Sequence, residues 1–277
     1  MKKKVYFCTQ NIRHQKVVAP NEKKKEMRNI AVILAGGTGS RVGGPVPKQF
    51  LELDGRTVIE YSIEAFASHP AIDEVAVVVH PDWRGRMEEI AERLKVKGER
   101  LKVRKIIDGG SERYMSSLNA IMAYIDEPDD TNLLLHDAAR PFVSAEIIDR
   151  VTEALKHHEA VGVAVPSTDT VWEVHPDVSG QWSVVGSQCE IPRFVARIPE
   201  RRLMWRAQTP QAFRLPLIRD AYQRALQDPR FQATDDCGVV RQYMPCTKIT
   251  VVEGDEANRK ITFAEDIAEM NRTGNTK

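Results

Sequence analysis

The stretch that decides the fold is Leu34-Ala35-Gly36-Gly37-Thr38-Gly39-Ser40-Arg41, which directly follows the apolar run Ile30 to Leu34. The apolar run predicts a buried first strand. The glycine-rich turn after it lets backbone N–H groups approach an anion with no Cβ in the way. Arg41 and the downstream Lys48 add two positive charges beside the turn. These features predict a triphosphate site at the end of the first strand.

Two common phosphate-binding motifs are excluded for this turn. The pattern G-x-G-x-x-G lacks its third glycine, because Val42 stands at that position after Gly37 and Gly39. A Walker A loop is excluded because Pro45 and Val46 stand where Lys and Ser or Thr are needed. The remaining pattern, L-A-G-G-x-G-x-R followed by P-K-Q, resembles the signature loop of nucleotidyltransferases that activate sugar and polyol phosphates. A glycine turn without a ligand is the alternative.

Apolar and amphipathic segments alternate regularly after Asn29. They predict strands at 30–35, 74–80, 102–107, 131–136 and 160–165, and helices at 57–67, 84–95, 112–124 and 144–157. This order indicates an α/β fold, a Rossmann-like, doubly wound and mostly parallel sheet with helices on both faces. Ligands bind such sheets at the carboxyl ends of the strands. We therefore expect the polar clusters at 36–41, 108–113, 136–140 and 167–170 to meet at one edge.

The alternation breaks after Pro166. Residues 168–203 contain several Pro and Gly and short alternating runs, which predict an extended β-hairpin arm outside the main sheet. Because such an arm buries little by itself, we expect a homodimer that forms through it; a surface loop is the alternative. The pattern then predicts a strand at 203–209, a helix at 215–227, a strand at 248–253 and a closing helix at 263–271.

The first 29 residues differ from the rest, because nine Lys or Arg face two Glu for a net charge of +7. They lack the apolar core of a secretion signal. We expect residues 1–29 to be a disordered basic leader without a catalytic role, and Met27 to be the natural start. A basic arm that binds RNA or a membrane surface is the alternative. Residues 30–271 are predicted to form one catalytic domain, and residues 272–277 a tail.

Composition narrows the function classes. The 277 residues carry a net charge of only +1, so we expect no nucleic-acid partner. No apolar stretch approaches the roughly 18 residues of a membrane-spanning helix, so we expect no membrane partner. The four cysteines lie far apart and form no C-x-x-C pair, which indicates reduced thiols in a cytoplasmic protein.

The segment His136-Asp137-Ala138-Ala139-Arg140-Pro141 ends a predicted strand. A carboxylate at this position is well placed to hold Mg²⁺ or another divalent cation, which takes hard oxygen ligands and bridges phosphates. Arg140 can pair with a phosphate or with Asp137 itself, and a purely structural Asp–Arg pair is the alternative. His136 is expected to pack or hydrogen-bond, because nothing clusters with it to suggest a set of three metal ligands.

The segment Asp108-Gly109-Gly110-Ser111-Glu112-Arg113, with Ser116 one turn further, ends another strand and opens a helix. Its free N–H groups could read the edge of a base, whereas a plain helix N-terminus is the alternative. Further polar positions lie in the second half of the chain. Each of these positions, taken alone, is more typical of a surface residue than of a ligand-binding one: Asp169-Thr170, Arg201, Thr209-Pro210-Gln211, Thr234-Asp235 and Lys260.

Taken in order, these motifs closely resemble one family, the 2-C-methyl-D-erythritol 4-phosphate cytidylyltransferases of the non-mevalonate isoprenoid pathway. The resemblance covers about residues 30–271. It rests on L-A-G-G-T-G-S-R with P-K-Q, D-G-G-S-E-R with Ser116, H-D-A-A-R-P, D-T, W-R-A-Q-T-P-Q-A-F, T-D-D and E-G with N-R-K-I-T. Met115 departs from the family, whose members often carry Asp there.

The resemblance implies three groups of site residues. Arg41, Lys48 and Lys260 would be catalytic and contact the triphosphate or the transition state. The nucleotide would be bound by Ala35, Gly36, Gly37, Gly39, Gly110, Ser111, Ser116 and Asp137, with Mg²⁺ on Asp137. The acceptor would be bound by Arg140, Thr170, Arg201, Thr209, Thr234 and Lys260.

The implied reaction joins CTP to a polyol phosphate, 2-C-methyl-D-erythritol 4-phosphate, and releases pyrophosphate by direct in-line attack. A ribitol-5-phosphate cytidylyltransferase is the nearest alternative, since it shares the scaffold and most motifs. Ala139 favours methylerythritol phosphate, because we expect a bulkier residue there in the ribitol enzymes. A catalytically inactive nucleotide-binding regulator is the third possibility.

Overall fold

The structure, a computed structural model, describes residues 27–37, 46–96, 103–176, 183–185, 188–190, 193–263 and 265–267. The predictions for residues 1–26, for Gly39 and Arg41, and for the tail at 272–277 therefore lie outside the described residues. So does most of the predicted closing helix, of which residues 265–267 are helical.

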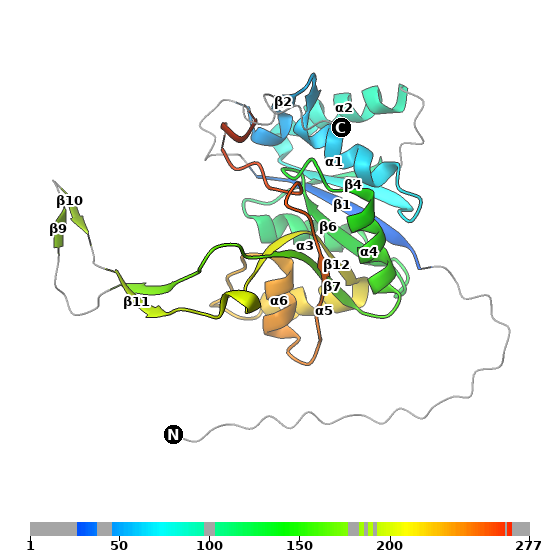
Figure 1. Cartoon of the computed structure of the whole chain (residues 1–277). Helices are drawn as coiled ribbons and strands as arrows, with labels where there is room; N and C mark the ends of the chain where they lie inside the picture. The colour runs from blue at the N-terminus through cyan, green and yellow to red at the C-terminus, as the bar shows by residue number, and fades with distance from the viewer. Residues whose placement is uncertain are drawn as a thin grey trace, which may run out of the picture.

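A seven-stranded sheet with the order β13-β7-β12-β6-β1-β4-β5 lies at the centre of the molecule (Figure 1). Its strands are β1 (Asn29–Ala35), β4 (Glu74–Val79), β5 (Val103–Asp108), β6 (Asn132–Asp137), β7 (Ala160–Pro166), β12 (Trp205–Arg214) and β13 (Thr250–Glu253). The strands of this sheet run parallel except β12, which is antiparallel to β6 and β7. β1 and β4 are apolar and almost completely buried, as expected for strands covered on both faces.

Helices cover both faces of the sheet (Figure 1). One apolar core joins the sheet to α1 (Val58–Ala67), α2 (Arg84–Val96) and α4 (Ala145–Leu155), and a second joins it to α3 (Arg113–Ala123), α5 (Leu215–Ala225) and α6 (Asp236–Tyr243). Because successive residues of a strand face opposite sides, Ile33 of β1 packs in the first core and Val32 in the second. The doubly wound, mostly parallel α/β fold is thus confirmed.

The predicted arm is a β-hairpin that stands away from the sheet, at the left of Figure 1. β8 (Glu173–Pro176) pairs with β11 (Arg193–Arg197), and β9 (Ser183–Val185) pairs with β10 (Gln188–Glu190), both antiparallel. The short β2 (Glu52–Leu53) and β3 (Arg56–Thr57) form a separate pair beside α1. Single turns of 3-10 helix lie at Lys48–Phe50, Pro81–Trp83 and Arg201–Leu203.

Two local predictions differ from the structure. The strand predicted at 203–209 is β12, which begins at Trp205 and continues to Arg214. It passes through Pro210 because the register shifts between Gln208 and Gln211, and a proline without an N–H is tolerated at such an irregularity. The helix α6 was not predicted, since its eight residues bury only three side chains and give little helical period.

Candidate functional site

The glycine turn after β1 packs against the turn after β5. A Cβ on Gly36 would lie 2.4 Å from Ser116 Oγ, and a Cβ on Gly109 would lie 3.0 Å from Gly36 Cα. Only glycine allows this approach. The buried Gln49 closes the turn from the other side, because its Nε2 donates to the carbonyl oxygens of Ala35 at 2.8 Å and Gly37 at 2.9 Å.

The close approach at Gly36 predicts that the adjacent glycines, Gly36 and Gly37, differ in how well they tolerate a side chain. Gly36→Ala is expected to lower the free energy of unfolding by about 1–3 kcal/mol, because the methyl group overpacks the buried Ser116. Gly37→Ala is the matched control, since a Cβ there meets no atom of the described residues within 4 Å. Urea denaturation measures both. Equal midpoints for the two variants would contradict the prediction, and adding Ser116→Ala to Gly36→Ala should recover part of the loss.

Two backbone N–H groups of the turn after β5 donate hydrogen bonds that hold this turn in place. Gly109 donates its N–H to the carbonyl oxygen of Val79 at 2.7 Å, and Gly110 donates its N–H to Ser116 Oγ at 3.2 Å. A Cβ on Gly110 would lie 2.2 Å from Met115 Cβ, so this position also requires glycine. The exposed Ser111 lies above the turn, with its Oγ 3.2 Å from Met115 Sδ. The structure therefore brings four predicted nucleotide residues, Gly36, Gly110, Ser111 and Ser116, to one place.

Asp137 ends β6 between two cations. Lys260 Nζ lies 2.6 Å from Asp137 Oδ2, and Arg113 Nε lies 3.1 Å from Asp137 Oδ1. Burial raises the pKa of Asp137, but the charges of Arg113 and Lys260 outweigh it and hold the pKa well below its ordinary range. The carboxylate is therefore ionised at neutral pH. Lys260, which lies far along the sequence, is thus brought next to Asp137.

The two predicted catalytic lysines approach the same loop, residues 254–262. Lys48 Nζ donates to the carbonyl oxygen of Ile261 at 2.7 Å, directly beside Lys260. The Ile261 N–H donates in turn to the carbonyl oxygen of Ala139 at 2.8 Å, which ties the loop to the end of β6. Lys48 therefore contacts the loop that carries Lys260, at the end of β6.

Arg140 holds the base of this loop. Its NH1 donates to the carbonyl oxygen of Asn258 at 2.7 Å, and its NH2 lies 3.3 Å from the carbonyl oxygen of Ala207. Asn258 is completely buried, and its Nδ2 donates to Gln208 Oε1 at 3.1 Å and to the carbonyl oxygen of Thr209 at 2.9 Å. Arg140 therefore contacts backbone as it stands, and the structural Asp137–Arg140 pair is not found among the described residues, where Asp137 pairs with Arg113 and Lys260.

His136 and Thr209 lie behind Asp137 and are buried. The Asp137 N–H donates to Thr209 Oγ1 at 3.1 Å, and Thr209 Oγ1 lies 3.0 Å from His136 Nδ1. His136 Nε2 lies 3.0 Å from the carbonyl oxygen of Arg140, so a neutral ring that donates from Nε2 and accepts at Nδ1 satisfies every partner. Burial lowers the pKa of His136 to about 4.

This neutral histidine makes stability depend on pH. The unfolded chain takes up a proton near pH 6.5, whereas folded His136 resists protonation until about pH 4. The free energy of unfolding is therefore expected to fall between these pH values as pH is lowered, by on the order of 3 kcal/mol. His136→Gln should be less stable at pH 7 but lack this slope. Urea titrations at four pH values test this, and an unchanged slope in the variant would contradict it.

Three predicted acceptor residues lie apart from Asp137. Thr170 and Arg201 are exposed at the base of the arm, where Arg201 NH1 lies 3.5 Å from the carbonyl oxygen of Thr168. Thr234 is exposed in the loop before α6. Among the interactions of the described residues, none joins these three side chains to Asp137 or Lys260. Thr209 is close to Asp137 but supports its backbone from inside.

Sequence reasoning missed residues that support the site. Arg113 was quoted only as part of a turn motif, yet it pairs with Asp137. Gln49 belongs to the quoted P-K-Q and orients the glycine turn. Asn258 belongs to the quoted N-R-K and orients the loop that carries Lys260. In each case the motif was visible, but the contact joins segments far apart in the chain.

The donor set limits how a metal could bind. Among the described residues, no group of three or more His, Cys, Asp or Glu could hold a metal ion. Asp137 stands between two cations, although carboxylate oxygens have further lone pairs to offer. This arrangement fits a magnesium ion that takes most of its ligands from phosphates and water, with Asp137 as one ligand. It does not fit a cage built by the protein alone.

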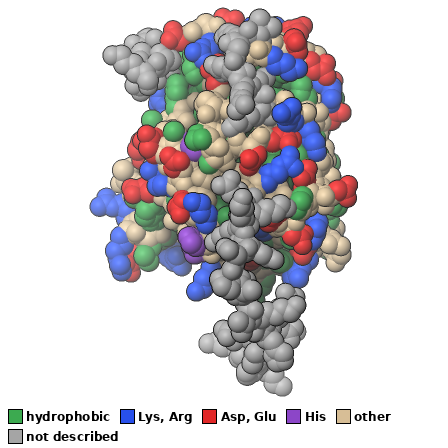
Figure 2. Space-filling model, turned by 90° about the vertical axis from the view of Figure 1, so that its right-hand side faces the viewer, with side chains coloured by type: hydrophobic (Ala, Val, Ile, Leu, Met, Phe, Trp, Pro, Cys, Tyr) green, Lys and Arg blue, Asp and Glu red, His purple; other side chains and the backbone are tan. Residues whose placement is uncertain are grey.

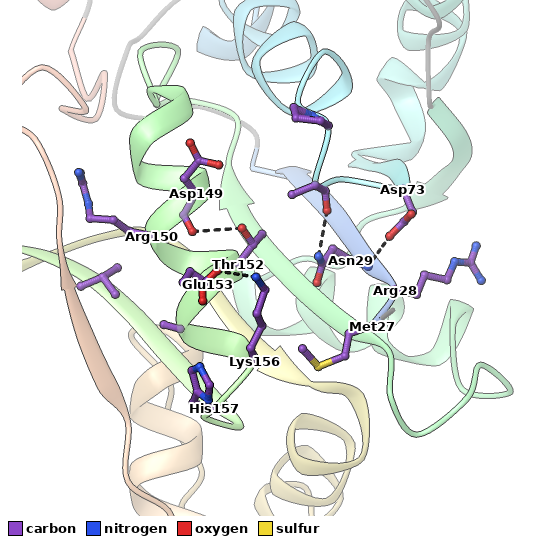
Figure 3. A pocket seen from close by; sticks show the side chains of 14 residues that line it. Met27, Arg28, Asn29, Asp73, Asp149, Arg150, Thr152, Glu153, Lys156 and His157 are labelled. Atoms are coloured by element: carbon purple, nitrogen blue, oxygen red, sulfur yellow. Dashed lines mark hydrogen bonds and ion pairs between the residues drawn. The ribbon is translucent and has the colours of Figure 1, made fainter. Parts of the chain in front are cut away.

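An open groove lies at the opposite edge of the sheet, beside the start of β1 (Figure 3). It is lined by residues that include Met27, Arg28, Asp73, Asp149 and Lys156. Its charges are paired locally, as Lys156 is with Glu153 at 2.5 Å. Because ligands of such sheets bind at the carboxyl edge, we do not assign the nucleotide to this groove.

Figure 2 shows Lys and Arg side chains interspersed with Asp and Glu over one face, without a continuous basic area in the part that is coloured by type. In the described ranges, no helix is both long and apolar enough to cross a membrane.

The glycine turn after β1, Asp137 and Lys260 lie at the carboxyl edge of a doubly wound sheet. This arrangement is that of an α/β nucleotidyltransferase. The crystal structure of the 4-diphosphocytidyl-2C-methyl-D-erythritol synthase from Anaerococcus prevotii DSM 20548 matches the protein with a TM-score of 0.72 and 28% identity, over 90% of this chain and 98% of that one. The family model IspD, 2-C-methyl-D-erythritol 4-phosphate cytidylyltransferase, matches residues 29–272. The chain therefore belongs to the IspD family.

Two relatives carry different names. The 2-C-methyl-D-erythritol 4-phosphate cytidylyltransferase of Thermobifida fusca (strain YX) is 45% identical over 241 residues, which are 87% of this chain and 91% of that protein. The bifunctional ribulose 5-phosphate reductase/CDP-ribitol pyrophosphorylase Bcs1 of Haemophilus influenzae is 37% identical over 87% of this chain and 47% of that protein. The ribitol alternative is thus less well supported, at lower identity.

Proposed function

We propose that this protein transfers the cytidylyl group of CTP to 2-C-methyl-D-erythritol 4-phosphate, with release of pyrophosphate. The observation that carries the proposal is that Lys260 pairs with Asp137 at the end of β6, while Lys48 contacts the next residue of the same loop, Ile261. Membership of the IspD family supports the choice of both substrates.

The reaction needs no general base. An anionic oxygen of the acceptor phosphate attacks the α-phosphorus of CTP, and the bond from that phosphorus to the bridging oxygen of the β-phosphate breaks. The electron pair leaves with pyrophosphate. The barrier is repulsion between anions and charge that builds on the phosphoryl oxygens, so catalysis consists of positioning and electrostatic stabilisation.

Each part of the site has a task in this reaction. The ammonium groups of Lys48 and Lys260 would neutralise charge on the phosphates and in the transition state. The turns at Gly36 and Gly110 pack around Ser116 and Met115, and the exposed Gly37 beside them is where the nucleotide would approach the backbone closely. We propose that Asp137 would offer one oxygen ligand to a Mg²⁺ ion held together with the triphosphate; when bound, the ion would supply neutralising positive charge.

The decisive experiment measures Mg²⁺-dependent pyrophosphate release from CTP with two acceptors. We expect kcat/KM for methylerythritol phosphate to exceed that for D-ribitol 5-phosphate by about 10²-fold, or roughly 2.7 kcal/mol of differential transition-state binding. The opposite preference would assign the ribitol reaction. Release with neither acceptor, together with CTP binding, would indicate a nucleotide-binding regulator.

The ribitol reaction remains the second candidate because of the 37% identical Haemophilus relative. Ala139 does not line an open acceptor site, because it is buried in a small core with Leu53, Val58 and Ile261. A bulkier residue there would act on the loop that carries Lys260 rather than contact the acceptor directly. Ala139 therefore supports the assignment only through that loop.

We further propose a homodimer that forms through the arm, in a cytoplasmic protein. Trp172, Phe194 and Ile198 are each more than half exposed on the arm, and apolar side chains gathered in this way favour a protein partner. Thr170 and Arg201 lie on the same segment, so docking of the arm could bring them to an acceptor. Light scattering after size exclusion tests the proposal, and the mass of a single chain would overturn it.

A further inference from the structure

Arg113 joins the carboxylate of the nucleotide site to a second, deeply buried carboxylate. Its Nε lies 3.1 Å from Asp137 Oδ1, and its NH1 lies 2.7 Å from Asp236 Oδ2. Asp236 is completely buried, so its charge requires a paired cation. The proposed reaction uses Asp137 and leaves Asp236 without a task.

Asp236 is held in place from two sides. Tyr222 donates its hydroxyl to Asp236 Oδ1 at 2.6 Å. The backbone N–H of Asp236 donates to Gln211 Oε1 at 3.0 Å, and Gln211 lies on β12 opposite Leu135 of β6. Since β6 ends at Asp137 two residues later, the two carboxylates are positioned by neighbouring strands of one sheet.

The guanidinium of Arg113 is well suited to pairing with Asp137 and Asp236 at the same time. Its planar fork presents several N–H donors in fixed directions, so one side chain can pair with two carboxylates at once. Burial works to lower the pKa of Arg113, but the attraction of Asp236 and Asp137 outweighs it and raises the pKa above its ordinary value. If Asp236 is replaced by a neutral residue, Arg113 keeps Asp137 as its one anionic partner and is no longer fixed from the other side.

We propose that Asp236 is a positioning residue for the nucleotide site, and that it acts through Arg113 to orient Asp137 and its partner Lys260. The inference rests on the proposed cytidylyltransferase function and adds a residue to its nucleotide-binding part. Asp236 itself contacts neither substrate in this proposal, because its carboxylate oxygens face Arg113 and Tyr222.

The test compares Asp236→Asn with Tyr222→Phe in the full chain. Both remove one polar interaction at the same buried carboxylate, but only the first removes the charge that holds Arg113. Both should lower the melting temperature. Below that temperature, Asp236→Asn should lower kcat/KM for CTP and weaken CTP binding about tenfold or more, because small misplacements of catalytic groups are costly. Tyr222→Phe should stay within about twofold of wild type.

Arg113→Lys provides the second variant, since an ammonium keeps the charge but lacks the fork. It should lose activity to a similar extent, and Asp236→Asn added to it should cause little further loss, because both act at one bridge. If the losses of the two single variants multiply in the double variant, the proposal is overturned. Normal CTP binding and activity in folded Asp236→Asn would overturn it as well. If Asp236→Asn fails to fold, a fully active Arg113→Lys overturns it. A wild-type protein that neither binds CTP nor releases pyrophosphate refutes the proposed function and this inference together.

Discussion

Lys260→Ala is expected to lower kcat for pyrophosphate release by about 10²- to 10³-fold, the range found when one donor to transition-state charge is removed. The loss has two sources. The ammonium that would neutralise charge on the phosphates disappears, and Asp137 Oδ2 loses its partner at 2.6 Å. Asp137 then keeps Arg113 as the cation on its other oxygen.

The matched control for Lys260 is Lys156→Ala, which removes the same charge from an exposed side chain of the groove at the far edge of the sheet. We expect its kcat to stay within about twofold of wild type. Initial rates with saturating CTP and acceptor measure both. A Lys260→Ala protein that keeps kcat and changes only KM would show that Lys260 binds the ground state and the transition state equally.

Lys48→Ala is expected to lower kcat by about 10²-fold or more, again on the scale of one lost donor. The structure adds a second consequence. Lys48 Nζ contacts the carbonyl oxygen of Ile261, so its removal also frees the loop that presents Lys260. Lys48→Arg should recover part of the rate if charge matters most, because it keeps the charge with a different shape.

The control for Lys48 is Lys95→Ala, at an exposed position on α2 where the ammonium pairs only with Glu92 among the described interactions. Its kinetics should match those of wild type. Near-normal kcat in Lys48→Ala, measured with both substrates saturating, would remove Lys48 from the catalytic group. Combining Lys48→Ala with Lys260→Ala should give less than the product of the single losses, since the two lysines share one loop.

Much of the fold was predictable because it depends on neighbours in the chain. The β-branched run at Glu74–Val79 predicts a strand buried on both faces, and the alternation of such runs with amphipathic helices predicts a doubly wound sheet. The glycine turn after β1 and the carboxylate after β6 were predicted for the same reason. Both follow directly from where a strand ends.

Irregular segments were harder to predict from local pattern. Proline argues against a central strand, yet β12 continues through Pro210 at a shift in register. The short helix α6 carries too few buried residues for its period to be detected. In both cases contacts with distant strands and helices outweigh the local preference of the sequence.

By itself, the sequence predicted most of the strand and helix order, the glycine turn after β1 with Lys48 downstream of it, and Asp137 at the end of a strand. Lys260 was added by the family resemblance. Only the tertiary structure decided their partners: Arg113 and Lys260 on Asp137, Arg140 on the backbone of Asn258, and Thr209 behind the site. The physical reason is that periodicity and turn chemistry act over a few residues. The meeting of Asp137, Arg113, Asp236 and Lys260 depends instead on which strands lie side by side and in which register, and only the packed sheet specifies that.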